Sequence, residues 1–331
     1  MAGAEDFVEI ARWGQRKLDF LKRFKPFTHG IPSHDTLNDV INALPCDTFS
    51  ECFTCWVETL RHADPDIVAI DGKTSRRARA KGGRPLHLVS AWAAEQRLVL
   101  GQEVVSGDME NEIVAIPRLL QRLELEGALV TIDAMGCQRD IAEVIRARGA
   151  DYLLALKANQ RSLHSEVAMY FADAGALERY QSVDGDHGRI EPRTAWVSHD
   201  VGWLQAERCA PGEPRFPGLA VLAMVKAEVE KDGQTTHSTR YYIGSASLSA
   251  KQILAASRAH WGIENRLHWV MYVVFHDDLM RLRTAHGPAN MAAIRHAARN
   301  LTEAITDKAS LKVRRKTLAW DDDYLETALR T

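Results

Sequence analysis

The stretches IVAID (67–71) and ALVTID (128–133) decide the fold that this sequence predicts. Each is a short apolar run that ends in an acid, which is typical of a buried strand with a carboxylate at its carboxyl end. If the two strands are neighbours, Asp71 and Asp133 lie together at the edge where open α/β sheets bind ligands. Either Asp taken alone is more simply explained as a turn former or a helix N-cap.

The segments around these two strands predict an α/β fold with a mixed sheet. Apolar runs at 86–92, 97–104 and 151–156 indicate three more strands, and amphipathic patterns at 111–124 and 138–148 indicate helices. The order along the chain is three strands, helix, strand, helix, strand. Such an alternation places helices against a sheet that contains parallel strands.

Changes in pattern divide the 331 residues into five regions. We expect a helical N-terminal region, the first part of an α/β core, a β-rich insertion, C-terminal helices that complete the core, and a tail whose end from Trp320 is solvated. Their bounds are 1–63, 64–180, 181–246, 247–310 and 311–331. The insertion is recognised by its Gly, Pro, Thr and Val content and its short extended runs.

Composition indicates an ordinary globular protein of the cytoplasm. Apolar residues make up 46% and charged residues 26% of the chain, and five cysteines fit a reducing compartment. No apolar run approaches the ~20 residues of a membrane span, and the acidic start lacks the pattern of a signal peptide. We therefore expect no membrane partner.

The net charge of −2 argues mildly against a nucleic-acid ligand, but the charge is unevenly distributed. Between positions 73 and 84 the chain carries six cations and no acid, among them Lys73, Arg76, Arg77 and Arg79. Such a local basic stretch predicts contacts with a phosphate backbone, although a solvated loop remains the simpler alternative.

A third acid, Glu264, lies in the predicted helix RAHWGIENRLHW (258–269). A mid-helix Glu usually faces solvent, but apolar neighbours make an unpaired acid expensive here. Carboxylates that lie together repel each other unless a cation lies between them, and Mg²⁺ prefers oxygen ligands. Asp71, Asp133 and Glu264 are therefore candidates to hold two Mg²⁺ or Mn²⁺ ions for phosphodiester chemistry.

Polar residues near these acids are candidate DNA contacts. His260 and His268 lie four residues on either side of Glu264, and we assign them to DNA contacts or supporting roles in preference to metal ligation. Asn265 is the residue next to Glu264. The loop KANQ (157–160) adds Lys157, Asn159 and Gln160 at the same end of the sheet, unless it is an ordinary polar loop. The motifs GxxxxGK[ST], GxSxG and HExxH are absent.

Together, several motifs resemble the DDE transposases of the H-repeat-associated, ISAs-type insertion-sequence family. They are AIDGK (69–73), LHLVSAW (86–92), TIDAMGCQ (131–138), DYLLALKANQ (151–160), HGRIE (187–191) and HWGIENRLHW (260–269). The resemblance covers about residues 8 to 304. It implies a ribonuclease H-like core with a β insertion, and it maps the catalytic and metal-binding triad onto Asp71, Asp133 and Glu264.

The resemblance also implies an activity and partners. It implies metal-dependent cleavage and strand transfer of double-stranded DNA, with the terminal inverted repeats of the element and a target as substrates. We expect a homodimer on DNA, associated with the nucleoid. Two alternatives stay open: a catalytically impaired DNA-binding remnant, because Tyr272 stands where the family usually has Asp, and a host nuclease on the same core. The β insertion and the HWGIEN helix favour the transposase over the nuclease.

Overall fold

A computed structural model describes residues 1–61, 66–75, 85–105, 111–186, 189–204, 215–231, 234–279 and 281–330. The strands it contains are β1 (Ile67–Ser75), β2 (Leu86–Ala93), β3 (Leu98–Val104), β4 (Leu129–Ile132), β5 (Asp151–Leu156), β6 (Glu178–Asp186), β7 (Arg189–Ser198), β8 (Val221–Lys231) and β9 (Gln234–Gly244). The helices are α1 (Phe7–Arg16), α2 (Leu18–Leu21), α3 (His34–Ala43), α4 (Cys46–Glu58), α5 (Glu112–Arg122), α6 (Arg139–Ala147), α7 (Arg161–Asp173), α8 (Ala250–Gly262), α9 (Trp269–Val273), α10 (Gly287–Glu303), α11 (Leu311–Trp320) and α12 (Asp322–Leu329).

These strands form one nine-stranded sheet in the order β3-β2-β1-β4-β5-β9-β8-β7-β6. Strands β1, β2 and β3 are antiparallel neighbours, whereas β4 and β5 run parallel to β1. Parallel neighbours need crossover connections, which α5 and α6 supply. This arrangement confirms the expected α/β class with a ribonuclease H-like mixed sheet.

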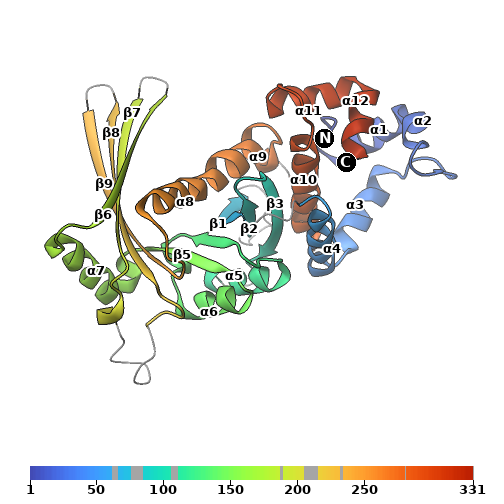
Figure 1. Ribbon diagram of the computed structural model, residues 1–331. Coiled ribbons are helices and arrows are strands. Elements are labelled where there is room, and N and C mark those ends of the chain that lie inside the picture. Colours follow the sequence, from blue (N-terminus) through green and yellow to red (C-terminus); the bar gives the residue numbers. More distant parts are fainter. Residues whose placement is uncertain are drawn as a thin grey trace.

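The core of the sheet lies where apolar runs from neighbouring strands meet. Val68, Ala69 and Ile70 of β1 are fully buried, as are Val130 of β4 and Leu154 of β5. Helix α5 contacts β2 and β3, α6 contacts β5, and α8 contacts β1, β4, β6 and β7. Figure 1 shows α5 and α6 below the sheet and α8 running diagonally above it. The sheet is thus covered on both faces, as its near-continuous apolar strands require.

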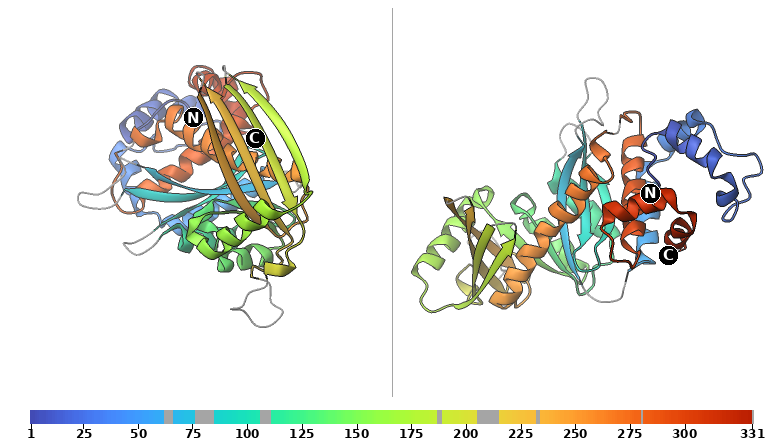
Figure 2. Two further views of the ribbon diagram at one scale, coloured as in Figure 1. Left: turned by 90° about the vertical axis from the view of Figure 1, so that its left-hand side faces the viewer. Right: turned by 90° about the horizontal axis from the view of Figure 1, so that it is seen from above.

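Strands β6 to β9 extend the core sheet beyond the β5 edge. Residues Leu153–Leu156 of β5 pair with Tyr241–Gly244 of β9 in antiparallel register. The four strands form the arm on the left of Figure 1, and the view from above in Figure 2 shows α8 leading from this arm to the centre of the molecule. The β-rich segment between α7 and α8 is therefore continuous with the core sheet rather than a separate layer.

Helices from both ends of the chain lie together on the other side of the core (Figure 1). Phe20, Ile305, Leu318, Leu325 and Ala328 form a buried apolar cluster there. The end from Trp320, expected to be solvated, is exposed at Trp320, Asp321 and Asp323, but it also forms α12, which Asp321 caps and which buries Leu325 and Ala328. Within the expected helical N-terminal region, Pro45 separates α3 from α4.

Candidate active site

Strand pairing brings two of the three predicted acids together. Ile70 of β1 is the register partner of Ile132 of β4, and the strands run parallel. Asp71 and Asp133 follow these partners directly, so they occupy equivalent positions on neighbouring strands, which lie about 4.8 Å apart. Asp71 does not close its strand as predicted: β1 continues to Ser75, and Asp71 pairs with Ser90 of β2. Asp133 does end β4 and caps the short turn that follows.

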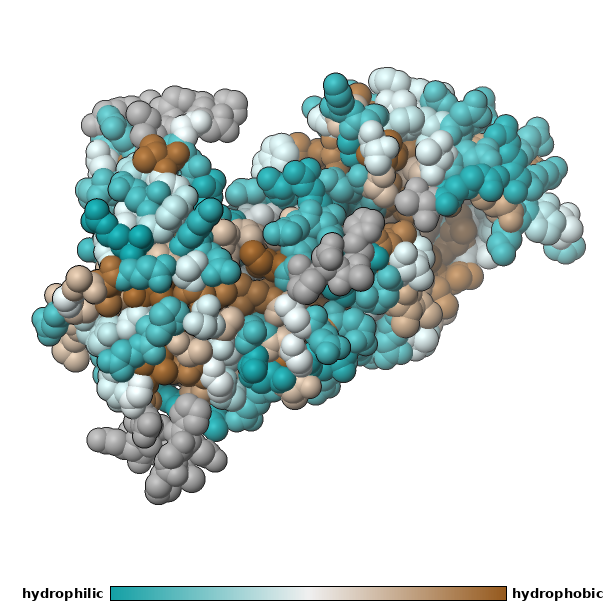
Figure 3. Space-filling view, in the orientation of Figure 1, coloured by the Kyte–Doolittle hydropathy of each residue, from teal (hydrophilic) through white to brown (hydrophobic). Residues whose placement is uncertain are grey.

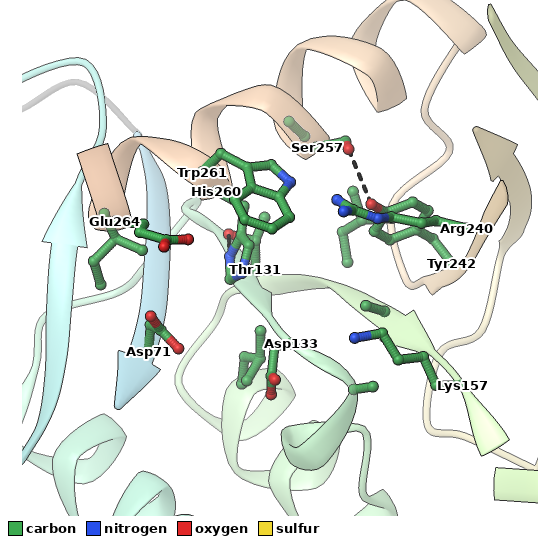
Figure 4. A pocket seen from close by; sticks show the side chains of 16 residues that line it. Asp71, Thr131, Asp133, Lys157, Arg240, Tyr242, Ser257, His260, Trp261 and Glu264 are labelled. Atoms are coloured by element: carbon green, nitrogen blue, oxygen red, sulfur yellow. Dashed lines mark hydrogen bonds between the residues drawn. The ribbon is translucent and has the colours of Figure 1, made fainter. Parts of the chain in front are cut away.

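Glu264 completes the group from the other side of a pocket. Asp71, Asp133 and Glu264 all line one cavity of about 220 Å³, below α8. Figure 4 shows the carboxylates of Asp71 and Glu264 turned toward each other, with Asp133 nearby and Lys157 pointing toward it. The structure thus brings the predicted triad to one pocket, from two strands and one helix.

The helix that carries Glu264 changes its winding at this residue. Helix α8 begins with a capping box at Ser249 and passes into a π-helical segment, Ile263–His268, before α9. Ile263 and Leu267 are buried and anchor the segment, while Glu264 is exposed to the pocket. Short π segments within α-helices are frequent at functional sites, and this one presents the third acid.

Burial, together with the neighbouring acids, makes Asp71 hold its proton more tightly than an exposed carboxylate does. Burial raises the pKa of Asp71 to about 7, opposed by a hydrogen bond from the Gly72 backbone, and the charges of Glu112, Asp133 and Glu264 raise it further. The ring of His268 approaches the Asp71 carboxylate, with 3.5 Å between Nδ1 and Oδ2. Burial, with Lys73 nearby, lowers the pKa of His268 to about 3, so this neutral ring does not offset the negative charge.

The donor set fits divalent cations that prefer oxygen. Three carboxylates line the pocket, and their mutual repulsion favours a bound cation. Within the described part of the chain, however, no three Asp, Glu, His or Cys side chains are close enough together to hold a single ion. If divalent cations bind in this pocket, Asp71, Asp133 and Glu264 would supply their carboxylate ligands.

Asn159 and Gln160 support the loop that carries Asp133. The Asn159 side-chain amide donates to the Ala134 carbonyl, and Gln160 Nε2 donates to the Cys137 carbonyl at 2.9 Å. Asp133 Oδ1 accepts from the Met135 backbone N–H at 2.9 Å. The two amides predicted to contact DNA thus have partners inside the protein, where they fix the turn after β4.

Three other predicted DNA contacts are turned inward. The Nδ1 atom of His260 lies 3.1 Å from the Thr131 hydroxyl, and burial lowers the pKa of His260. Lys73 pairs with Asp277, and His268 lies against Asp71. All three side chains are only partly exposed and already have partners within the protein.

The remaining predicted contacts fall into two groups. Lys157 and Asn265 are exposed; Lys157 lines the acid pocket, and Asn265 lines an adjoining groove of about 490 Å³ along β7–β9. Arg76, Arg77 and Arg79 lie outside the described residues.

Arg240 and Trp261, which were not predicted as site residues, lie where the pocket and this groove meet. The Arg240 guanidinium stacks on the Trp261 ring, 4.5 Å from its centroid. Trp261 was within the quoted HWGIEN motif, but Arg240 comes from β9, and only the long-range pairing of that strand reveals its position.

Glu112 and His87 form a second missed group beside Asp71. Oε1 of Glu112 lies 2.8 Å from Nε2 of His87, whose Nδ1 lies 2.7 Å from the Thr74 hydroxyl. Glu112 is the first residue of α5, after the N-cap Asn111. Its charge is the largest of the carboxylate contributions that raise the pKa of Asp71.

Gly72 is required for this close approach. A Cβ atom at Gly72 would lie 2.1 Å from Glu112 Oε1 and 2.8 Å from His87 Nε2. We expect Gly72→Ala to displace the Glu112 side chain and to lower the free energy of unfolding by about 1–3 kcal/mol. Chemical denaturation measures this loss.

Gly175→Ala is the matched control, because no atom lies within 4 Å of its new Cβ. In a Glu112→Ala background, Gly72→Ala should lower the free energy of unfolding by about 1 kcal/mol less than it does in the wild type, because the principal clash is gone. Equal costs in the two backgrounds would disprove the steric explanation.

Comparisons with known proteins identify the family of this chain. Residues 62–301 match the family model described as a transposase DDE domain, and residues 1–57 match the model of a segment associated with it. The "H repeat-associated putative transposase YhhI" of Escherichia coli K12 is 36% identical over 343 residues, which cover 99% of this chain and 89% of that protein. The "Putative transposase YncI" of Escherichia coli O157:H7 is 37% identical over 344 residues, with coverages of 99% and 86%.

Among solved structures, a cryo-EM structure of a piggyBac transposase synaptic complex with hairpin DNA aligns with 100% of this chain and 80% of its own chain. The sequence identity is 11% and the TM-score is 0.44.

Proposed function

Because this chain belongs to the family of transposases with a DDE domain, we propose that it cleaves and joins DNA strands at the ends of an insertion sequence. One observation carries the proposal: the parallel pairing of β1 and β4 places Asp71 and Asp133 on neighbouring strands, in one pocket with Glu264. The three acids are the proposed catalytic residues. The three acids come from three distant parts of the chain. If Asp71 and Asp133 only formed turns, and if Glu264 only faced solvent, nothing would require them to meet in one pocket.

In this proposal, Asp71, Asp133 and Glu264 hold two Mg²⁺ or Mn²⁺ ions. When bound, the ions would supply the Lewis-acid chemistry that activates a water or a 3′-hydroxyl and stabilises the leaving oxygen of a phosphodiester. The protein's own part is to fix the ligands. Asn159 and Gln160 hold the turn after Asp133, and the buried Ile263 and Leu267 hold the segment that carries Glu264.

The cationic side chains at the rim are the proposed phosphate contacts. Lys157 points into the pocket toward Asp133, and Arg240 lines both the pocket and the adjoining groove (Figure 4). The exposed Asn265 and Trp261 extend this surface. The space-filling view in Figure 3 shows mainly hydrophilic side chains around a hollow between the β6–β9 arm and the helices of the chain termini. We propose that duplex DNA, with its terminal repeat, approaches this face.

We further propose that two copies act together on paired element ends in the nucleoid, since strand transfer must join both ends to one target. None of the helices in the described parts of the chain is long and apolar enough to cross a membrane.

The alternative of an impaired remnant rests on Tyr272. This residue is 55% exposed on α9 and is not one of the residues that line the acid pocket. The position of Tyr272 therefore gives no structural support to the alternative of a catalytically impaired remnant. The alternative of a host nuclease is disfavoured by the near full-length match to H repeat-associated relatives.

The proposal predicts that the purified protein cuts DNA that carries the inverted repeats flanking its gene, and does so only with Mg²⁺ or Mn²⁺. The measurement is strand cleavage on a labelled duplex, resolved on a denaturing gel. A duplex with a scrambled terminal repeat controls for nonspecific nicking. Cleavage that persists in EDTA, or that is equal on both duplexes, would contradict the proposed function.

A further inference from the structure

Lys73 links the strand of one catalytic acid to the helix of another. Lys73 is two residues after Asp71 on β1, so both side chains leave the same face of the sheet. Its Nζ lies 2.7 Å from Asp277 Oδ2 and donates to the His268 backbone carbonyl at 3.1 Å. The Lys73 and Asp277 side chains are only 20% and 18% exposed.

Both partners belong to the end of the segment that presents Glu264. His268 is the last residue of the π-helical turn, and Asp277 begins a short 3₁₀ turn just after α9. The Asp277 carbonyl in turn accepts a hydrogen bond from Arg295 of α10 at 3.3 Å. Lys73 therefore joins β1, the π segment and the turn packed on α10 through a single ammonium group.

We infer that Lys73 is a positioning residue that sets the spacing between Asp71 and Glu264. The π segment has no strand pairing to fix it against β1, so its position depends on side-chain contacts such as this one. A partly buried ion pair with a second hydrogen bond to a backbone carbonyl fixes the direction of both side chains, and removing one partner leaves the other without its hydrogen bond. The inference rests on the proposed function, because spacing matters only if the two acids share a cation.

A contact between Lys73 and DNA phosphates is the competing role, and it makes a different prediction. A phosphate contact contributes about 0.9 to the magnitude of the salt slope of DNA binding. A positioning residue already occupied by Asp277 contributes nothing to that slope. The two roles are therefore separable by binding measurements without any cleavage assay.

The test is Mn²⁺ binding to the DNA-free protein, followed by the electron paramagnetic resonance signal of free Mn²⁺. We expect Lys73→Met to weaken Mn²⁺ binding by about 10-fold or more, the usual effect of losing a partner that orients metal ligands. Lys73→Arg keeps the charge and the reach, and we expect it to restore most of the affinity. The salt slope of DNA binding should not change.

Lys17→Met is the matched control. Lys17 pairs with Asp322 at the same 2.7 Å, with side chains 29% and 36% exposed, between helices of the two chain ends. Lys17→Met should lower the melting temperature, as we also expect of Lys73→Met. Unlike Lys73→Met, it should bind Mn²⁺ with the affinity of the wild type. If Lys73→Met does not fold, Asp277→Asn carries the same test, because it keeps the shape and removes the charge.

The outcomes separate this inference from the proposed function. Wild-type Mn²⁺ affinity in both Lys73→Met and Asp277→Asn would overturn the positioning role alone. A salt slope reduced by about 0.9 in Lys73→Met, with wild-type Mn²⁺ affinity, would replace that role with a phosphate contact. A wild-type protein that binds no Mn²⁺ would overturn the proposed metal site, and this inference with it.

Discussion

Replacing any one of the three acids by its amide is expected to reduce strand cleavage by at least about 10³-fold. The amide keeps the shape of the side chain but removes the charge that holds a cation. Loss of a bound cation removes several kcal/mol of transition-state stabilisation. A loss of about 4 kcal/mol corresponds to a 10³-fold lower rate of strand cleavage. The variants are Asp71→Asn, Asp133→Asn and Glu264→Gln, assayed on DNA carrying the terminal repeats.

DNA binding by the same variants should be retained, since phosphate contacts come from cationic side chains. Glu143→Gln is the control: Glu143 lies on α6, 51% exposed, and pairs with Arg139. It should cleave as the wild type does. A triad variant with more than about a tenth of wild-type activity would remove that residue from the proposed site, because 1.4 kcal/mol is too small for a lost metal ligand.

The positions of Asp71 and Asp133 could be predicted from the sequence because the signals for them are local. An apolar run that ends in an acid indicates both a strand and the place of its carboxylate, and Asp133 lies where this pattern puts it. Asp71 follows the same pattern, yet β1 continues through Lys73 to Ser75. The continuation depends on pairing with β2, which an apolar pattern in β1 alone does not reveal.

The parts that the sequence did not predict depend on long-range contacts. The pairing of β9 with β5 joins segments about 90 residues apart and brings Arg240 to the pocket. Lys73 and Asp277 are 204 residues apart, so Lys73 reads in the sequence as one more cation of a basic stretch. The amides Asn159 and Gln160 likewise read as available polar groups, until the fold gives them backbone partners after β4.

The charge on Asp71 should make the metal-free protein less stable as pH rises. The folded protein holds the proton of Asp71 up to about pH 7, against an ordinary value of 3.8. Between these two values the folded state binds more protons at this site than the unfolded chain does, so the free energy of unfolding falls as pH increases. Each unit of difference between the folded-state and unfolded-state pKa of Asp71 lowers the free energy of unfolding by at most about 1.36 kcal/mol.

Asp71→Asn carries no charge at any pH and should therefore be more stable than the wild type in EDTA at pH 8. We expect a gain on the order of 2–3 kcal/mol, allowing for solvent screening of a side chain that is 29% exposed. The gain should shrink toward pH 4, where Asp71 is protonated in the wild type. Urea denaturation at several pH values measures it.

Glu143→Gln should show no comparable gain, because solvent screens that exposed carboxylate. Adding Mg²⁺ at pH 8 should stabilise the wild type but not Asp71→Asn, since a cation that binds only the folded state adds to its stability. Lower stability of Asp71→Asn at pH 8 would show that Asp71 is held by favourable contacts. Higher stability of Asp71→Asn at pH 8 would show that the charge on Asp71 destabilises the metal-free protein. In the proposed function, cation binding is the reason why the pocket keeps this charge.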